Sequence, residues 1–134
     1  MVSKIVLEEY FLFPDFIEYW SPTVVDLPTQ RRDKALSRLT DFGEMRLTAM
    51  NEAGIARAVL ALAGSGVQAE RDTATATRRA RAANDFLARE IDKRPDCYSG
   101  FGHLAMQDAR AAADELERCI REGRCAGPLL QRTP

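Results

Sequence analysis

Apolar runs along the chain predict three strands and the start of a fourth. The run 5–7 is continuous rather than alternating, which is typical of strands covered on both faces, as in a parallel sheet. Residues 55–62 predict a second buried strand, although their alanines are also compatible with a helix. Residues 98–104 form a third candidate strand, and 125–130 begins like a fourth. A longer segment with a different pattern separates each run from the next.

These separating segments place apolar residues three and four positions apart, which predicts helices. One helical pattern covers 31–53, with a break marked by Gly43, and a second covers 72–93. Asp108 is a good N-cap for a third helix, which we expect to end at Gly123. Its predicted inner face comprises Ala109, Ala112, Ala113, Leu116, Cys119 and Ile120.

Residues 14–30 lack a dominant period. Three prolines fall in this segment, and Phe16, Tyr19 and Trp20 lie between them. The pattern predicts a long loop with room for one helical turn. Long ordered loops that carry aromatic residues are more often functional than random.

Alternation of strands with helices predicts an α/β fold, in which a parallel sheet is connected by right-handed crossovers. The chain has 134 residues, of which 46% are hydrophobic and 29% are charged. This is the balance of a soluble globular protein, and the length fits one domain over residues 1–134.

Charge and cysteine content exclude several classes of protein. With 19 basic and 20 acidic residues, the net charge of -1 provides no positive field to attract nucleic acid or an anionic membrane. Three cysteines without CxxC spacing indicate reduced thiols rather than a disulfide framework or a zinc site. Because the first apolar run is too short for a signal peptide or a membrane span, we expect a cytoplasmic protein.

Three groups of segments follow one another in the order and spacing of a known family. The first is 4–11 with Pro14; the second is 46–55 with 66–68; the third is 83–85, 94–96, 100–104 and 114–119. Together they resemble the amino-terminal part of the amidohydrolase-superfamily decarboxylases, which act on hydroxylated benzoates such as γ-resorcylate and 2,3-dihydroxybenzoate. The resemblance runs from about Lys4 to Gly127, nearly the whole chain.

The resemblance implies a (β/α)8 (TIM) barrel that holds a divalent metal, Zn or Mn, at the carboxyl ends of its strands. A complete barrel needs roughly 250 residues, so we expect a truncated segment with about the first three to four βα units. The implied reaction is the non-oxidative decarboxylation of a small aromatic carboxylic acid, with the metal chelating the carboxylate and the ortho hydroxyl. A metal-dependent hydrolase of the same superfamily is the nearest variant.

By the same resemblance, Glu8 and Tyr10 are candidate metal ligands. Glu8 matches the family's ligand glutamate, whereas Tyr10 stands where many members have histidine, and a neutral tyrosine with a pKa near ~10 is a poor ligand. Because strand side chains alternate, Glu8 and Tyr10 should both point into the barrel mouth, with Glu9 turned towards a helix. The alternative is a structural Glu8 paired with a lysine or arginine at a strand end.

Candidate substrate-binding residues follow the first two strands. Phe11 and Trp20 belong to the aromatic segment that would help cover the substrate, and Ala63 and Ser65 precede the second long helix. His103, the only histidine, stands where the resembling proteins usually carry a small residue. It is either a barrel-layer or edge histidine with one ring nitrogen hydrogen-bonded, or a metal ligand or acid-base group beside Glu8.

Two other functions remain open from the sequence. A non-catalytic fragment or pseudoenzyme that associates with a partner is favoured by Tyr10 and by the lack of the family's later ligands. An independent binding module would require the turn 63–66 to hold a phosphate, although it has neither a P-loop lysine nor a full GxGxxG. A partial parallel sheet leaves an unpaired edge, so we expect a homo-oligomer or a complementary chain, with Cys125 and Leu129 at that edge.

Overall fold

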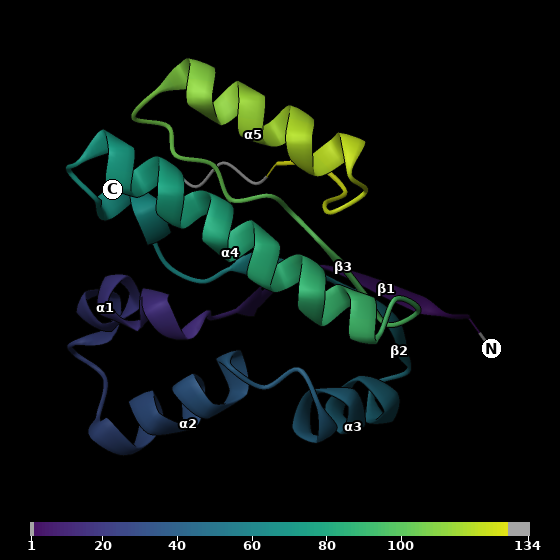
Figure 1. The fold of residues 1–134 in the computed structure, drawn as a ribbon. Coiled ribbons are helices and arrows are strands. Elements are labelled where there is room, and N and C mark those ends of the chain that lie inside the picture. Colours follow the sequence, from purple (N-terminus) through teal and green to yellow (C-terminus); the bar gives the residue numbers. More distant parts are fainter. Residues whose placement is uncertain (1, 129–134) are drawn as a thin grey trace.

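Residues 2–128 are described by a computed structural model (Figure 1), which shows an α/β fold with a three-stranded parallel sheet. The strands are β1 (Lys4–Phe11), β2 (Ile55–Leu62) and β3 (Tyr98–Gly100), in the order β1-β2-β3. The predicted parallel sheet is confirmed, and β2 has the predicted bounds. The third strand is shorter than predicted, because its ladder with β2 ends at the pair Leu60–Gly100.

Five helices and three 3-10 turns connect or follow the strands within the described residues. The helices are α1 (Ile17–Trp20), α2 (Thr29–Leu39), α3 (Glu44–Glu52), α4 (Thr73–Lys93) and α5 (Ala109–Arg121). The 3-10 turns are Pro14–Phe16, Ser21–Val24 and Gly66–Ala69. The predicted break at Gly43 is confirmed, since this residue precedes α3. The segment 14–30, predicted as a long loop with room for one helical turn, contains more helical turns than that, because Pro14 and Pro22 lie at the starts of two 3-10 turns on either side of α1.

Aspartates begin the two longest helices, as their sequence positions favour. Asp72 accepts a hydrogen bond from the Thr75 backbone N–H at 2.8 Å, and Asp108 accepts from the N–H groups of Arg110 and Ala111. Each carboxylate thereby satisfies backbone donors that have no partner inside the helix.

The main hydrophobic core lies between one face of the sheet and the helices. Ala58, Leu60 and Leu62 alternate along β2 towards this core, where they meet the small inner face of α4, including Ala80 and Ala83. Alanines on this face allow the helix to approach the sheet closely. In Figure 1, α4 lies between α5 and the pair α2 and α3.

Strand β1 is irregular at its centre. Its register with β2 shifts between Val6 and Glu9, so that one extra residue is accommodated in β1. Glu8 lies in this β-bulge with a φ of 59°. A bulge re-aims side chains and increases local twist, and such bulges are frequent next to active sites.

Helix α5 differs from its predicted orientation. Ala112 and Cys119 are buried as predicted, but Ala109, Ala113 and Ile120 are exposed. Two charged residues, Glu115 and Arg118, are buried on the inner face instead. The helix is therefore rotated towards polar partners on α4 that the apolar spacing did not show.

The segment after α5 begins to pair with the third strand, as the sequence predicted. The N–H groups of Ala126 and Gly102 donate to Gly100 and Gly127, and Gly102 forms a parallel bridge with Pro128. Leu129, predicted to lie at the sheet edge, is outside the described residues; Cys125 is half-buried beside Gly102.

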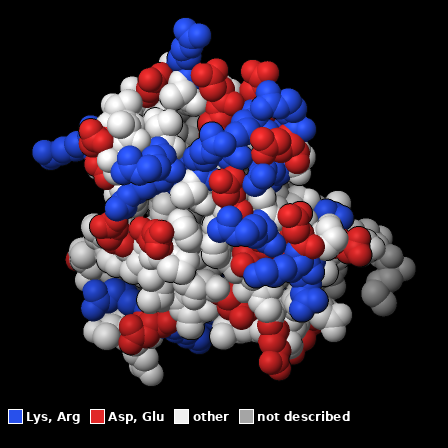
Figure 2. Space-filling view, viewed as in Figure 1, with Lys and Arg blue, Asp and Glu red and all other residues white. Residues whose placement is uncertain are grey.

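The surface carries charges of both signs. Figure 2 shows basic and acidic side chains interspersed over the face that is viewed. No helix within residues 2–128 is long and apolar enough to cross a membrane.

Candidate functional site

Glu8 projects from the bulge of β1 and is exposed. Among the described residues, no lysine or arginine forms an ion pair with its carboxylate, and no donor forms a hydrogen bond to it. The left-handed backbone at a residue with a side chain costs roughly 1–2 kcal/mol, because Cβ approaches the carbonyl oxygen. The fold therefore keeps an unpaired carboxylate in an unfavourable backbone conformation.

Tyr10 and Glu9 lie on opposite faces of β1. Tyr10 pairs in register with Ala61, whereas Glu9 pairs with Leu60, whose side chain faces the helices. Tyr10 is 42% exposed, and both residues border a groove of about 400 Å³ beside α2 and α3. The Arg46 guanidinium fixes the strand here by donating to the Tyr10 carbonyl at 2.9 Å.

Three of the predicted substrate-binding residues meet where β1 and β2 end. The Cα and Cδ1 atoms of Trp20 lie 3.6 Å from the position that a Cβ atom would take at Gly64. Gly64 separates Ala63 from the half-buried Ser65, and the Ala63 N–H donates to the Phe11 carbonyl at 2.9 Å. Trp20, Ala63 and Ser65 thus share the carboxyl edge of the sheet, where βα loops form sites in parallel folds.

Phe11 does not present its ring to this edge. The side chain is 1% exposed, and its ring packs against Phe42 and Phe86 with centroid distances of 5.7 and 6.4 Å. Phe11 is thus a core residue on the helix-facing side of the sheet, and only its backbone reaches the loop after β2.

His103 is buried at the same edge, with 6% of its surface exposed. Its Nε2 atom accepts a hydrogen bond from the Val67 N–H at 3.1 Å, and its ring meets Phe16 edge-on at 6.0 Å. Burial lowers the pKa of His103 to about 4, so the ring is neutral at pH 7. In this arrangement Nε2 is occupied by the backbone donor.

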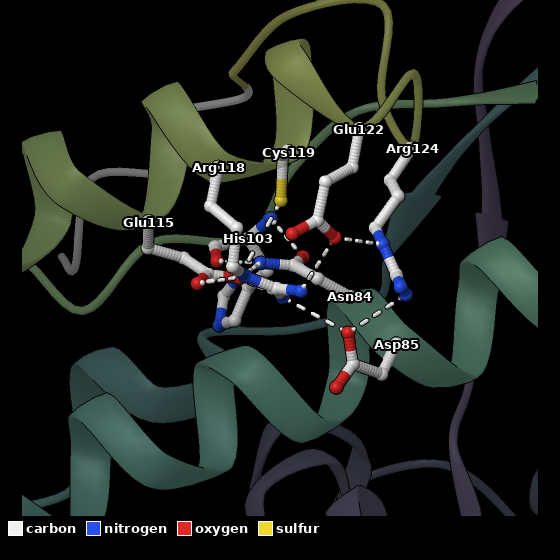
Figure 3. A network of polar contacts seen from close by, with 8 residues as sticks. All are labelled: Asn84, Asp85, His103, Glu115, Arg118, Cys119, Glu122 and Arg124. Atoms are coloured by element: carbon white, nitrogen blue, oxygen red, sulfur yellow. Dashed lines mark hydrogen bonds and ion pairs between the residues drawn. The ribbon is translucent and has the colours of Figure 1, made fainter.

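A polar network behind His103 links α4 and α5 (Figure 3). Asn84 binds both the N–H and the carbonyl of His103, at 2.7 and 2.9 Å, and also donates to Glu115. Arg118 contacts Glu115 at 2.7 Å and Asp85 at 2.9 Å. Burial would raise the pKa of Glu115, but the hydrogen bonds from Arg118 and Asn84 lower it overall.

The sequence interpretation did not assign this network a role. The local sequence feature that points to this network is Asn84, a polar residue on the inner face of α4, which otherwise consists of alanine and leucine.

A second polar cluster joins α1 to α4 near the same edge. The Tyr19 hydroxyl donates to Glu70 at 2.7 Å and accepts from Arg79 at 2.8 Å, and Arg79 also pairs with Glu18. Burial and the bond to Glu70 raise the pKa of Tyr19 to about 12. These contacts hold the segment after β1 against the segment after β2.

The described residues do not complete a metal site. Within residues 2–128, no group of three or more His, Cys, Asp or Glu side chains is arranged to hold a metal ion. Glu8 supplies one carboxylate, Tyr10 supplies a neutral phenol, and Nε2 of His103 is hydrogen-bonded. Zinc sites in proteins use three or more protein ligands, so a site of that kind would need further ligands from outside residues 2–128.

Comparison with known proteins identifies clear relatives, although no protein-family model matches the chain. It is 39% identical over 134 residues to the γ-resorcylate decarboxylase of Polaromonas sp. strain JS666, covering 97% of this chain and 39% of that protein. A structure of dihydroxybenzoic acid decarboxylase from the same organism, with bound manganese and 2-nitroresorcinol, superposes with a TM-score of 0.90 and 39% identity. That match covers 98% of this chain and 39% of the solved one.

A second solved structure extends the likeness. The 2,6-dihydroxybenzoate decarboxylase complexed with 2,6-dihydroxybenzoate has a TM-score of 0.90 and 37% identity, over 98% of this chain and 40% of that one. The chain spans about two fifths of the length of the relatives it matches. Along nearly its whole length, it is therefore similar in sequence and in fold to the hydroxybenzoate decarboxylases that its sequence segments indicated.

Proposed function

We propose that this chain is a segment of a metal-dependent decarboxylase, with about the first three to four βα units of a (β/α)8 barrel. The reaction would break the bond between the carboxylate and the aromatic ring of a hydroxylated benzoate. Carbon dioxide leaves, and a proton takes its place on the ring carbon. Relatives with bound manganese and with bound 2,6-dihydroxybenzoate support this metal and this substrate class.

One observation in the structure supports the choice of Glu8 as a metal ligand. Glu8 stands where the resembling decarboxylases have a ligand glutamate, and it combines a φ of 59° with a carboxylate that has no partner among the described residues. A strained residue that stabilises no neighbour is a candidate for function, because strain persists where a site requires it. We assign Glu8 as a metal ligand and Tyr10 as a residue beside that metal.

The loops at the carboxyl edge would hold the aromatic substrate. Trp20 packs on Gly64, and the adjacent Ser65 offers a hydroxyl at the same edge. Phe11 would act from the core by fixing the start of the loop. His103 is not proposed as a ligand, because its Nε2 atom accepts from Val67. When bound, the divalent ion would supply charge stabilisation for the substrate carboxylate.

The proposal is tested by elemental analysis of the purified chain and by loss of 2,6-dihydroxybenzoate. We expect Glu8→Ala to lower manganese affinity by at least roughly tenfold. The matched control is Glu9→Ala, which removes the neighbouring carboxylate, paired in register with the helix-facing Leu60, and should leave bound metal unchanged. If the unsubstituted chain binds manganese, equal loss in the two variants, or no loss in either, would contradict the assignment of Glu8.

A second function is favoured by the incomplete ligand set within residues 2–128. On that reading the chain acts only in association with a second polypeptide. A folded chain that binds no manganese and consumes no substrate alone, but does both when mixed with the remaining part of a γ-resorcylate decarboxylase, would support association. Activity of the chain alone would exclude it.

A further inference from the structure

The ring of His103 is lodged against the backbone of the loop that follows β2. A Cβ atom at Gly66 would lie 2.4 Å from Nε2 of His103, far inside the normal contact distance. Gly66 has a φ of 54°, so this position requires glycine both for its backbone and for the space that the ring occupies. The next residue, Val67, donates its N–H to the same Nε2 atom.

His103 itself is held from the opposite side. The Asn84 side chain accepts from the His103 N–H and donates to its carbonyl, so it binds the backbone as a neighbouring strand would. The Asn84 amide donates a hydrogen bond to Glu115 at 2.9 Å, and the Arg118 guanidinium also donates to Glu115 (Figure 3). Residues of α4 and α5 therefore hold the backbone of His103, while its ring contacts the loop on the other side.

Other contacts join the same two loops nearby. Gln68 donates to the Leu104 carbonyl, and Gln107 donates to the carbonyls of Val67 and Glu70. These glutamines are half-buried or exposed, whereas the His103–Val67 bond is buried. Water can replace a bond at the surface, but a buried N–H that loses its acceptor remains unsatisfied. Among these contacts between the two loops, the buried His103–Val67 bond is therefore the one that water does not replace.

We propose that His103 is a positioning residue that holds the loop 63–67 against Trp20 and so sets the place of Ser65 at the carboxyl edge of the sheet. The chain of contacts runs from α5 through Asn84 to His103, and from Nε2 to Val67. The functional consequence rests on the proposed function, in which this loop lines the substrate site. The structural part does not depend on activity.

The test compares two substitutions in the full chain. His103→Gln places an acceptor oxygen at the same number of bonds from Cα as Nε2, whereas His103→Met has similar length and ends in a methyl group that accepts nothing. Amide hydrogen exchange of Val67 is measured at neutral pH, and the fluorescence of Trp20, the only tryptophan, reports the packing of Gly64. Ala58, whose N–H donates to Cys97 at 2.9 Å in the sheet, reports global opening.

In His103→Met we expect Val67 exchange to accelerate by roughly tenfold or more and Trp20 emission to shift to the red. In His103→Gln both signals should stay close to those of the unsubstituted chain, and Ala58 should be unchanged in both variants. Gly66→Ala disturbs the same contact from the loop side and should reproduce the Met result. This variant takes the place of His103→Met if that protein does not fold.

Three results would overturn the proposal. They are unchanged Val67 exchange in His103→Met, equal acceleration in the Gln and Met variants, and equal acceleration at Val67 and Ala58. The first means that the bond does not hold the loop, the second that an acceptor is not what matters, and the third that the whole fold has weakened. Because no metal or substrate is present, the outcome is independent of whether the chain is a decarboxylase.

Discussion

Glu8 has a left-handed backbone conformation, which is unfavourable for a residue that carries a Cβ atom. It is the one non-glycine residue with a positive φ in the described part of the chain. Nothing in the run Ile5–Val6–Leu7 signals a bulge, because the extra residue is revealed only by the pairing with β2. Sequence alone therefore identified Glu8 through a resemblance but not the strain that it bears.

Glycine at this position should relieve that strain. We expect Glu8→Gly to raise the free energy of unfolding by about 1 kcal/mol, because glycine adopts positive φ without a Cβ clash. Glu9→Gly is the control and should lower it by about 0.5–1 kcal/mol, as glycine does within a strand. Urea denaturation measures both. A Glu8→Gly protein that is as destabilised as Glu9→Gly would show that Glu8 is not strained.

Burial of His103 makes stability depend on pH. Its pKa falls from 6.5 to about 4 on folding, so the unfolded chain binds a proton between these values and the folded chain does not. This contribution is fully present above pH 6.5 and is lost as the pH falls towards 4, with a full size of about 3 kcal/mol.

His103→Gln removes this group from the titration. We expect the difference in unfolding free energy between pH 7 and pH 4.5 to be smaller in the variant by about 2–3 kcal/mol. Urea denaturation at the two pH values measures it, and carboxylates that also titrate there are common to both proteins. The same pH dependence in both proteins would mean that folding does not lower the pKa of His103.

Among the helices and strands, the sequence correctly predicted those features that depend on residues close together in the chain. Strand β2, the cap Asp108 and the break at Gly43 depend on neighbouring residues and were confirmed. The face of α5 was wrong, since it depends on Asn84, which lies 31 residues before Glu115. Spacing of apolar residues carries no information about a polar partner so far away.

Substitutions on the buried side of α5 should lower the free energy of unfolding more than substitutions on its exposed side. Glu115→Ala leaves Arg118 with only 9% of its side chain exposed and one fewer partner, so we expect a loss of roughly 2–4 kcal/mol. The control is Glu117→Ala on the same helix, where the pair with Arg121 is 3.8 Å long and exposed. That change should cost less than roughly 0.5 kcal/mol. Equal effects in thermal unfolding would show that α5 is not docked through this network.

Across the whole molecule, the sheet leaves apolar side chains at its β1 edge. Val2, Ile5 and Leu7 are 88%, 63% and 67% exposed. An edge strand with exposed apolar residues is a ready template for another chain. This edge offers a place for the rest of a barrel or for a second copy of the chain, whereas the sequence predicted the unpaired edge at Cys125 and Leu129, on the β3 side of the sheet.

Association through this edge should be sensitive to one charge. We expect the chain to sediment as concentration-dependent oligomers and Leu7→Lys to shift it towards monomer, since charged residues block edge pairing. Val25→Lys, at an equally exposed apolar residue outside the sheet, is the control and should leave the distribution unchanged. A monomer at all concentrations, or equal effects of the two substitutions, would contradict an interface at β1.

The parallel pairing of β1 with β2 also orders events during synthesis. β1 leaves the ribosome before β2, yet Lys4 pairs with Ile55 and Phe11 with Leu62, so β1 cannot pair with β2 until about fifty more residues exist. Closing so long a loop costs more entropy than local contacts do, and such pairings form slowly. Through that interval the apolar residues of β1 lack the strand that covers them in the folded sheet. The strand that bears the proposed ligand Glu8 therefore reaches its place in the sheet only after β2 has been made.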